Sequence, residues 1–158
     1  MTVRPFRVTD LEAVVALERQ AFPSEPYSPP VFVQLSELFP TTFFVADDAR
    51  GRVLGYAIVG RRGDQPASGV LLSMAVSTDC QRAGLGTQLL VAAMEVASEE
   101  RVATLDLTVS QKNVSAVAFY TSLGFRVVGD VPDMFGPDRS RLRMRRSIEG
   151  FGRAALGA

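Results

Sequence analysis

The sequence of 158 residues contains no histidine and only one cysteine, Cys80. Without histidine the chain has no Ser-His-Asp triad, no Cys-His pair and no His-ligated zinc. A single cysteine also excludes a disulfide framework and a cysteine-cluster metal site, so we expect no bound metal. Any general acid or base therefore comes from tyrosine, aspartate, glutamate, the single Lys112 or water.

An excess charge and long apolar runs are also missing. The 17 basic and 17 acidic side chains cancel, so no net field attracts nucleic acid. No apolar run approaches the ~20 residues of a membrane-spanning helix, and no signal-peptide pattern opens the chain. Arginine dominates the cations, which is typical of GC-rich bacterial genomes. The hydrophobic content of 47% suffices for one core. We expect a cytoplasmic, bacterial, globular protein with no nucleic-acid or membrane partner.

The pattern of apolar residues, prolines and glycines predicts the element order β-α-α-β-β-β-α-β-α-β-β. The predicted strands are Thr2–Val8, Thr42–Ala46, Val53–Gly60, Val70–Val76, Thr104–Val109, Arg126–Val131 and Ser140–Arg146. The predicted helices are Asp10–Phe22, with Asp10 as its cap, Val31–Leu38, Gly84–Ser98 and Asn113–Leu123. The proline-rich stretch Pro23–Pro30 is expected to be a loop. Hairpins followed by β-α-β crossovers indicate one α/β domain over residues 1–149, with a flexible tail at 150–158.

A glycine-rich turn joins the fourth predicted strand to the next helix. It reads Gln81-Arg82-Ala83-Gly84-Leu85-Gly86-Thr87. Such a turn directs several unpaired N–H groups and a helix dipole at one point, which favours an anion, usually phosphate. The third glycine of the dinucleotide fingerprint and the Gly-Lys-Ser/Thr of a P-loop are absent. From these residues alone, a plain tight turn is the alternative.

Two motifs carry a resemblance to a known family. The turn Gln81–Gly86 resembles the Gln/Arg-x-x-Gly-x-Gly/Ala pyrophosphate loop of the GNAT acyl-CoA-dependent N-acetyltransferases. The second motif, Asn113-x-x-Ala116-x-x-Phe119-Tyr120-x-x-x-Gly124-Phe125, is similar to the other signature of that family. The resemblance spans about residues 2–146. It implies a mixed, mostly antiparallel central sheet flanked by helices, with the fourth and fifth strands splayed apart. It also implies acetyl-CoA as the acyl donor, and homodimers are frequent in the family.

The same resemblance implies a set of donor-binding residues. Backbone N–H groups of the turn would hold the pyrophosphate, the fourth strand would run beside the pantetheine arm, and Asn113 would contact that arm. The N–H of Val76 would polarise the thioester carbonyl. The full expected set is Ala75, Val76, Gln81, Arg82, Ala83, Gly84, Leu85, Gly86, Thr87, Asn113 and Phe119.

Tyr120 is the candidate general acid for the departing thiolate. A phenol with a pKa near ~10 is protonated at neutral pH and can pass a proton to a thiolate whose conjugate thiol has a pKa near ~8.5. The alternative is a helix tyrosine whose ring packs under the sheet beside Phe119.

The general base is less defined by the sequence. The glutamate that some members carry on the fifth strand is replaced by Thr108. Ser73, Thr108 or Ser110 could hold a water in its place. Glu25 lies in a loop resembling the acceptor loop of protein N-terminal acetyltransferases, including the ribosomal-protein alanine enzymes, and is a candidate catalytic residue. Its alternative is a solvated loop carboxylate.

The acceptor is expected to be a peptide or protein α-amine. An α-amino group has a pKa near ~8 and a lysine near ~10.4, so the α-amine is far more often neutral at pH 7. The aromatic pair expected before the last strand is reduced to Met134-Phe135, which counts against the ribosomal-protein acceptor. A small amine such as a polyamine, amino sugar or antibiotic, and a non-catalytic acyl-CoA-binding module, are the alternatives.

Arginines alternate with other residues along the last predicted strand, at positions 139, 141, 143 and 145. This spacing places them on one face. We expect a solvated outer face that protects an edge strand from pairing. A docking face for an acidic partner or for the ribose phosphate of the donor is the alternative.

Overall fold

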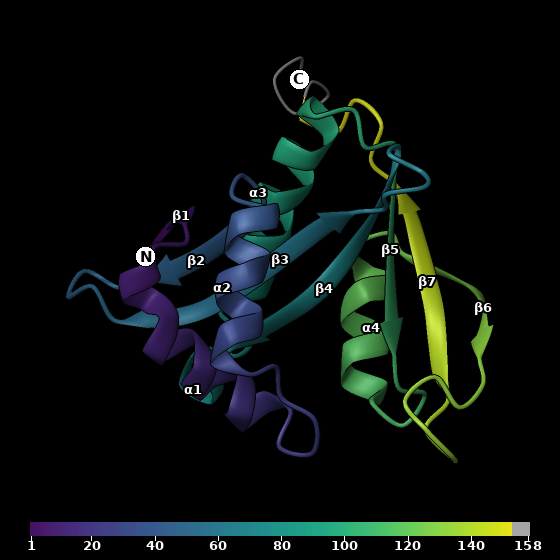
Figure 1. Cartoon of the computed structure of the whole chain (residues 1–158), viewed down its shortest axis with the longest axis horizontal. Helices are drawn as coiled ribbons and strands as arrows, with labels where there is room; N and C mark the ends of the chain where they lie inside the picture. Colours follow the sequence, from purple (N-terminus) through teal and green to yellow (C-terminus); the bar gives the residue numbers. More distant parts are fainter. Residues whose placement is uncertain (153–158) are drawn as a thin grey trace.

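The elements follow the predicted order. The computed structural model describes residues 1–152. The strands are β1 Thr2–Pro5, β2 Phe43–Asp47, β3 Val53–Arg61, β4 Ser68–Val76, β5 Thr104–Val109, β6 Arg126–Val131 and β7 Arg141–Ser147. The α-helices are α1 Leu11–Ala21, α2 Pro29–Leu38, α3 Leu85–Glu99 and α4 Val114–Ser122 (Figure 1). Short 3-10 turns precede α1 and α3, at Val8–Asp10 and Thr78–Cys80.

All seven strands form one sheet, in the order β1-β2-β3-β4-β5-β7-β6. Every neighbouring pair is antiparallel except β4 and β5, which are parallel. The predicted α/β fold with a mixed, mostly antiparallel sheet is therefore confirmed. The predicted hairpin between β2 and β3 is also confirmed, since these strands pair antiparallel across their short connection.

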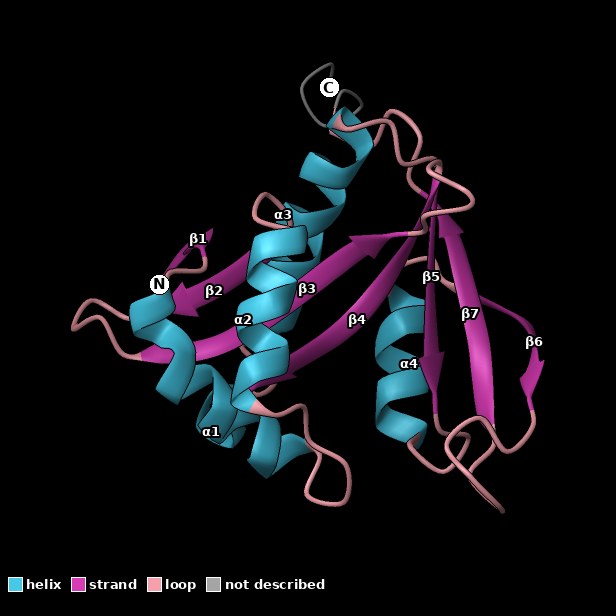
Figure 2. Ribbon diagram, viewed as in Figure 1, coloured by secondary structure: helices cyan, strands magenta, loops and turns pink. Residues whose placement is uncertain are grey.

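Helices cover both faces of this sheet (Figure 2). On one face, α1 and α2 pack against β2 and β3 through a core that includes Val14, Phe32 and Tyr56. On the other face, α3 and α4 pack against a core that includes Leu90 and Met144. Because side chains alternate along a strand, β2, β3 and β4 supply residues to both cores.

The start of α2 differs from the prediction. Pro29 and Pro30, expected in a loop, occupy the first helical positions. Proline fits there because the N–H that it lacks has no partner in the first turn of a helix, and its fixed φ is helical. Asp10 occupies the N-cap position of α1, as predicted, but its side chain makes no hydrogen bond to that helix. Its carboxylate accepts a hydrogen bond from the Arg7 N–H at 2.8 Å and pairs with Arg4 at 2.9 Å, and β1 ends at Pro5 rather than at Val8.

The end of the described chain lies against α3. The N–H of Phe151 donates to the Ser98 hydroxyl at 3.2 Å, and the Arg146 guanidinium lies 4.8 Å from the centre of the Phe151 ring. Residues 153–158 of the predicted tail lie outside the described residues. Among residues 1–152, no helix has the length and apolar character needed to cross a membrane.

Candidate functional site

Strands β4 and β5 are paired over only a short stretch. The parallel ladder ends at Val70 and Asp106, after three residue pairs. Beyond it β4 continues to Val76 and β5 to Val109, and the two strands diverge with α4 behind the gap (Figure 1). The expected splay of the fourth and fifth strands is thus present. It leaves backbone groups on the facing edges of both strands without a neighbouring strand.

The N–H of Val76 points from β4 toward β5. The next N–H along the chain, that of Ser77, donates to the Leu54 carbonyl of β3 at 2.7 Å. Opposed residues in an antiparallel pair alternate between bonded and non-bonded, so Val76 opposite Gly55 is a non-bonded pair. Ala75, opposite Tyr56, directs its backbone groups toward β3 instead. Of the two residues predicted to line the donor, only Val76 therefore presents its N–H to the diverging edge.

The predicted pyrophosphate loop lies between the 3-10 turn and α3. Arg82 and Gly84 have left-handed φ values of +69° and +79°, and such an alternation turns successive N–H groups toward one side. The first helical bond of α3 runs from the Gln88 N–H to the Gly84 carbonyl at 3.0 Å. The N–H groups of the three preceding residues, Leu85, Gly86 and Thr87, lie in the first turn of the helix, where no helical carbonyl is available. The preceding residues of the turn, Gln81, Arg82, Ala83 and Gly84, are exposed.

The second motif begins at the N-cap of α4. The Asn113 side-chain oxygen accepts a hydrogen bond from the Ala116 N–H at 3.1 Å. This bond satisfies one donor of the first turn, which explains why asparagine starts the helix. Asn113 is exposed, and its amide NH2 is the group left to contact a ligand.

The two motifs meet where α3 and α4 approach each other. A Cβ placed on Gly86 would lie 3.3 Å from the Phe119 ring and 3.7 Å from a Val76 methyl. Such a contact is closer than most real Cβ contacts, so glycine is the residue that lets these elements approach. Phe119 therefore packs against the predicted pyrophosphate loop at Gly86. The sequence alone did not predict that contact.

Tyr120 lies on α4 with its ring between two phenylalanines. The ring centres of Phe119 and Phe125 are 5.2 Å and 5.8 Å away, both edge-on. Burial raises the pKa of the phenol to about 12, and the nearby Arg141 charge lowers it in part. The phenol is thus protonated at neutral pH. Both sequence interpretations of Tyr120 fit this position, because the ring packs under the sheet while the hydroxyl retains its proton.

Glu25 forms an ion pair with Arg139. Glu25 lies in the loop between α1 and α2, and Arg139 lies in the loop between β6 and β7. These loops lie on opposite sides of the open end between β4 and β5 (Figure 2). Both side chains are about half exposed, at 48% and 49%. The predicted catalytic residue is therefore held by a cation in this structure.

Glu18 is a buried carboxylate that the sequence analysis missed. It lies on α1 with 2% of its surface exposed. One carboxylate oxygen accepts the Tyr27 N–H at 2.9 Å, and the other accepts the hydroxyls of Ser73, at 3.0 Å, and of Tyr56. Glu18 follows Val14 by four residues and thus lies on the apolar stripe of α1. A charged residue at a position of the apolar stripe was the sequence signal that could have identified Glu18.

The arginine row of β7 does not form a solvated outer face on an edge strand. β7 is paired on both sides, and β6 is the edge. Arg143 and Arg145 point at Asp106 of β5, which is 1% exposed and is also paired with Arg62. Burial opposes ionisation of Asp106, but the Arg145 hydrogen bond and the surrounding positive charges together lower its pKa. The prediction was wrong because strand order, which decides the edge, is set by contacts far apart in the sequence.

Arg141 is placed differently from the other arginines of this strand. It donates to the Thr108 carbonyl at 2.9 Å, and its guanidinium lies 5.2 Å from the centre of the Phe135 ring.

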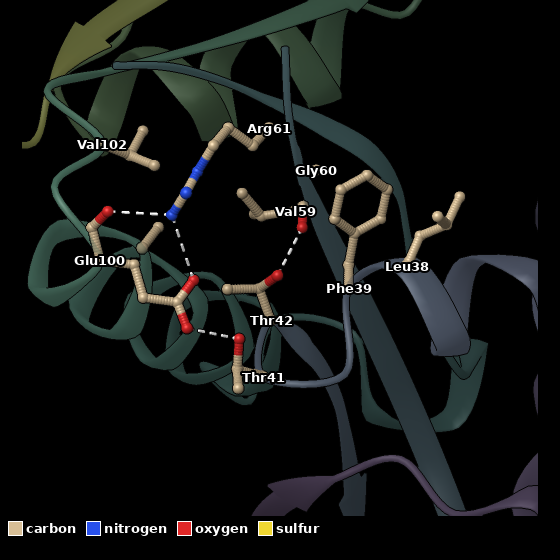
Figure 3. A pocket seen from close by; sticks show the side chains of 10 residues that line it. Leu38, Phe39, Thr41, Thr42, Val59, Gly60, Arg61, Glu100 and Val102 are labelled. Carbon is tan, nitrogen blue, oxygen red and sulfur yellow. Dashed lines mark hydrogen bonds and ion pairs between the residues drawn. The ribbon is translucent and has the colours of Figure 1, made fainter. Parts of the chain in front are cut away.

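A separate pocket lies near the C-terminal end of α3, at the closed end of the splay (Figure 3). Its polar groups bond one another. The Arg61 guanidinium donates to the Glu100 carbonyl oxygen at 2.9 Å, and the Thr41 hydroxyl donates to the Glu100 carboxylate at 2.6 Å. None of the predicted site residues lines this pocket. These bonds hold the C-terminal end of α3 to β3. The pocket is not part of the candidate site.

Comparisons with known proteins agree with this geometry. The Acetyltransferase (GNAT) family matches residues 11–125. The N-alpha-acetyltransferase of Sulfurisphaera tokodaii is 31% identical over 136 residues, 80% of each chain. The ribosomal protein bS18-alanine N-acetyltransferase of Escherichia coli is 32% identical over 124 residues, 78% of this chain and 80% of that one. The crystal structure of Ard1 from Thermoplasma volcanium matches with a TM-score of 0.85 at 25% identity, over 92% of this chain and 96% of that one.

Proposed function

Because this chain belongs to the GNAT family and is an acetyl-CoA-dependent N-acetyltransferase, we propose that its acceptor is the α-amino group of a peptide or protein. The similarity to two relatives carries this proposal. One is named an N-alpha-acetyltransferase and the other a ribosomal-protein alanine N-acetyltransferase, and each matches about four fifths of the chain, 80% and 78%. Chemistry supports it, because an α-amine has a pKa near ~8 and is often neutral without an active-site base.

In this proposal the donor binds from the side of α3 and α4. The N–H groups of residues 82–87, with the dipole of α3, hold the pyrophosphate. The pantetheine arm lies along the diverging edge of β4, and the Asn113 amide contacts it. The Val76 N–H, which faces that edge, donates to the thioester carbonyl and stabilises the negative charge that develops on its oxygen.

Tyr120 is the proposed general acid. It belongs to α4, the helix that lies behind the gap between β4 and β5 (Figure 1), and the donor enters from the side of this helix. With its pKa raised to about 12, the phenol carries a proton at every physiological pH. It protonates the thiolate as the carbon–sulfur bond breaks.

The acceptor enters from the opposite face, past the loop that carries Glu25. The Glu25 carboxylate attracts the positively charged amine terminus of the acceptor. The acceptor takes the place of the Arg139 guanidinium, which is an exposed and therefore weakly held partner. We assign Glu25 to acceptor entry, because its side chain is about half exposed and comes from a loop beside the open end between β4 and β5.

The test is release of CoA from acetyl-CoA with matched peptides. One peptide has a free α-amine and no lysine, the second is the same peptide with an acetylated α-amine and one lysine, and a polyamine is the small-molecule arm. We expect turnover with the first peptide and little with the others, with mass spectrometry locating the acetyl group on the α-nitrogen. Faster turnover of the polyamine or the lysine peptide would overturn the assignment of the acceptor.

A further inference from the structure

Glu18 is a buried negative charge with only neutral partners. Its three hydrogen bonds come from a backbone N–H and from two hydroxyls, those of Ser73 and Tyr56. Within residues 1–152, no arginine or lysine lies within ion-pair distance of it. Burying a carboxylate without a counter-charge is costly, even when hydrogen bonds satisfy its oxygens. If the Glu18 side chain only filled space in the core, an uncharged residue would do so equally well.

The hydrogen bonds connect this charge to the splayed part of β4. Ser73 lies three residues beyond Val70, the last residue of β4 that pairs with β5. Its side chain is on the face that α1 and α2 cover, because it pairs with Ile58, a member of that core. This is the face from which the acceptor enters in the proposed function. The Tyr27 hydroxyl, from the acceptor loop, donates to the Leu72 carbonyl beside it at 3.2 Å.

The Ser73 oxygen remains free to accept a proton. A hydroxyl has one proton and two lone pairs. Both Ser73 and Tyr56 give their proton to Glu18, so the lone pairs of Ser73 receive no proton from Tyr56, although the two oxygens are 3.0 Å apart. An N–H group that reached Ser73 from the gap between the strands would find an acceptor already bonded to a carboxylate.

We propose that Glu18 is the proton acceptor of the reaction and acts through the Ser73 hydroxyl. The neutral amine nitrogen forms a bond to the thioester carbon, and the carbonyl electron pair moves to the oxygen. The nitrogen, now positive, passes a proton through a bridging water to Ser73 as the Ser73 proton passes to Glu18. The carbon–sulfur bond then breaks, and the sulfur takes a proton from Tyr120. Glu18 returns its proton to solvent and Tyr120 regains one, so the cycle balances.

No other group around Glu18 changes charge near neutral pH. Tyr56 of β3 and Tyr27 of the acceptor loop both have raised pKa values, chiefly because of burial and also because of the Glu18 charge. Ser73 of β4 does not titrate, and Phe32 of α2 is apolar. Glu18 is thus the carboxylate among these groups, the others being phenols, a hydroxyl and an apolar ring. This step deepens the proposed function and rests on it, but it does not depend on which amine is the acceptor.

The test compares Glu18→Gln and Ser73→Ala with Glu12→Gln, an equal change at an exposed position of the same helix. With an α-amine peptide at pH 7, we expect the first two to lower kcat/KM about 100-fold or more and Glu12→Gln to leave it unchanged. Ser73→Thr, which keeps the hydroxyl, is expected to restore most of the activity. Calorimetric affinity for acetyl-CoA is expected to stay at the wild-type value in all four variants.

A second acceptor distinguishes proton transfer from structural support. An aminooxy-terminated peptide has a weakly basic nitrogen that loses its proton to water readily once it is bonded to carbon. We expect the defects of Glu18→Gln and Ser73→Ala to shrink to a few-fold with it. An equal loss with both acceptors, or full activity of Ser73→Ala with the ordinary peptide, would overturn the proposal. A wild-type protein that turns over no amine would instead contradict the proposed function.

Discussion

Replacing Tyr120 by phenylalanine removes one oxygen atom and leaves the ring in contact with Phe119 and Phe125. We expect kcat to fall about 10–100-fold, because the thiolate must then take its proton from water. Acetyl-CoA affinity, measured by calorimetric titration, is expected to stay the same, since the hydroxyl does not hold the donor. A kcat equal to that of the wild type would leave Tyr120 with a packing role only.

The pH profile of the wild type follows from the same phenol. Burial raises the pKa of Tyr120 to about 12, and the Arg141 charge opposes part of that rise. The acid form is therefore present up to about pH 10. We expect kcat/KM with an α-amine peptide to rise until the amine is neutral, near pH ~8, and then to stay level. The measurement is CoA release from pH 6 to 10. A fall in kcat/KM centred below pH 9, in protein that remains folded, would contradict the assignment.

Single site residues can be proposed from the sequence where a motif contains them. The loop Gln81–Thr87 and Tyr120 lie in contiguous patterns that can be read from sequence spacing. Glu18 was missed because its partners, Tyr27, Tyr56 and Ser73, come from three other segments. Only the folded sheet brings them together. The roles of Ser73 and Glu25 were left open for the same reason, since their neighbours are set by tertiary contacts.

The turn before α3 depends on a left-handed residue, and a second glycine provides a matched control. Gly84 and Gly51 have φ values of +79° and +77°, and added Cβ atoms would meet nothing within 4 Å at either. Alanine at either position is therefore expected to cost about 1 kcal/mol of folding stability. Gly84→Ala alone is expected to weaken acetyl-CoA binding, about 10-fold, because it reorients the N–H groups of the loop. Gly51 lies in the β2–β3 hairpin, away from the site.

Thermal unfolding and calorimetric titration of both glycine variants measure these effects. Equal acetyl-CoA affinity in Gly84→Ala and Gly51→Ala would show that the conformation of the loop does not control donor binding.

Elements with a strong local signal were predicted within a residue or two. Strand β5 was predicted at its observed bounds, Thr104–Val109, and α3 ends one residue beyond the prediction, at Glu99. The start of α2 was wrong because Pro29 and Pro30 disrupt a helix interior but suit a first turn. Sequence spacing does not distinguish these two settings. The bulge between Ile58 and Val59 likewise has no local signature.

Asp106 holds the two halves of the sheet together at the closed end of the splay. It joins β5 to Arg145 of β7 and to Arg62, just beyond β3. Replacing Asp106 with asparagine leaves these arginines without their counter-charge, so we expect a loss of about 3 kcal/mol in the free energy of unfolding at pH 7. Asp64→Asn, an exposed control, is expected to change it by less than about 0.5 kcal/mol.

The difference between wild type and Asp106→Asn is expected to depend on pH. The pKa of Asp106 is lowered in the folded state, so its contribution is present above the unfolded value, near ~3.9, and is lost as pH falls through the folded value. Urea unfolding at pH 7 and at pH 3 measures this. A difference that grows on acidification would contradict this account of Asp106.

The ion pair between Glu25 and Arg139 joins two loops across the open end between β4 and β5. We expect Arg139→Glu to lower kcat/KM for an α-amine peptide several-fold, because two carboxylates repel and displace the acceptor loop. The double exchange, Glu25→Arg with Arg139→Glu, is expected to restore the loop but not acceptor entry, since the attracting charge has moved. The measurement is kcat/KM for the peptide with the wild type, Arg139→Glu and the double variant. A fully active double variant would remove Glu25 from acceptor binding.

The divergence of β4 and β5 separates two ways of binding a substrate, one for the donor and one for the acceptor. On the proposed assignment, the donor is held mainly by backbone N–H groups, those of Val76 and of the turn before α3, whereas the acceptor meets side chains such as Glu25. A point mutation changes a side chain but leaves an N–H in place. Over evolutionary time, therefore, substitutions on the α1 and α2 face can exchange one acceptor for another while the donor stays the same. This division makes the acceptor loop the natural target for redesign toward new amines.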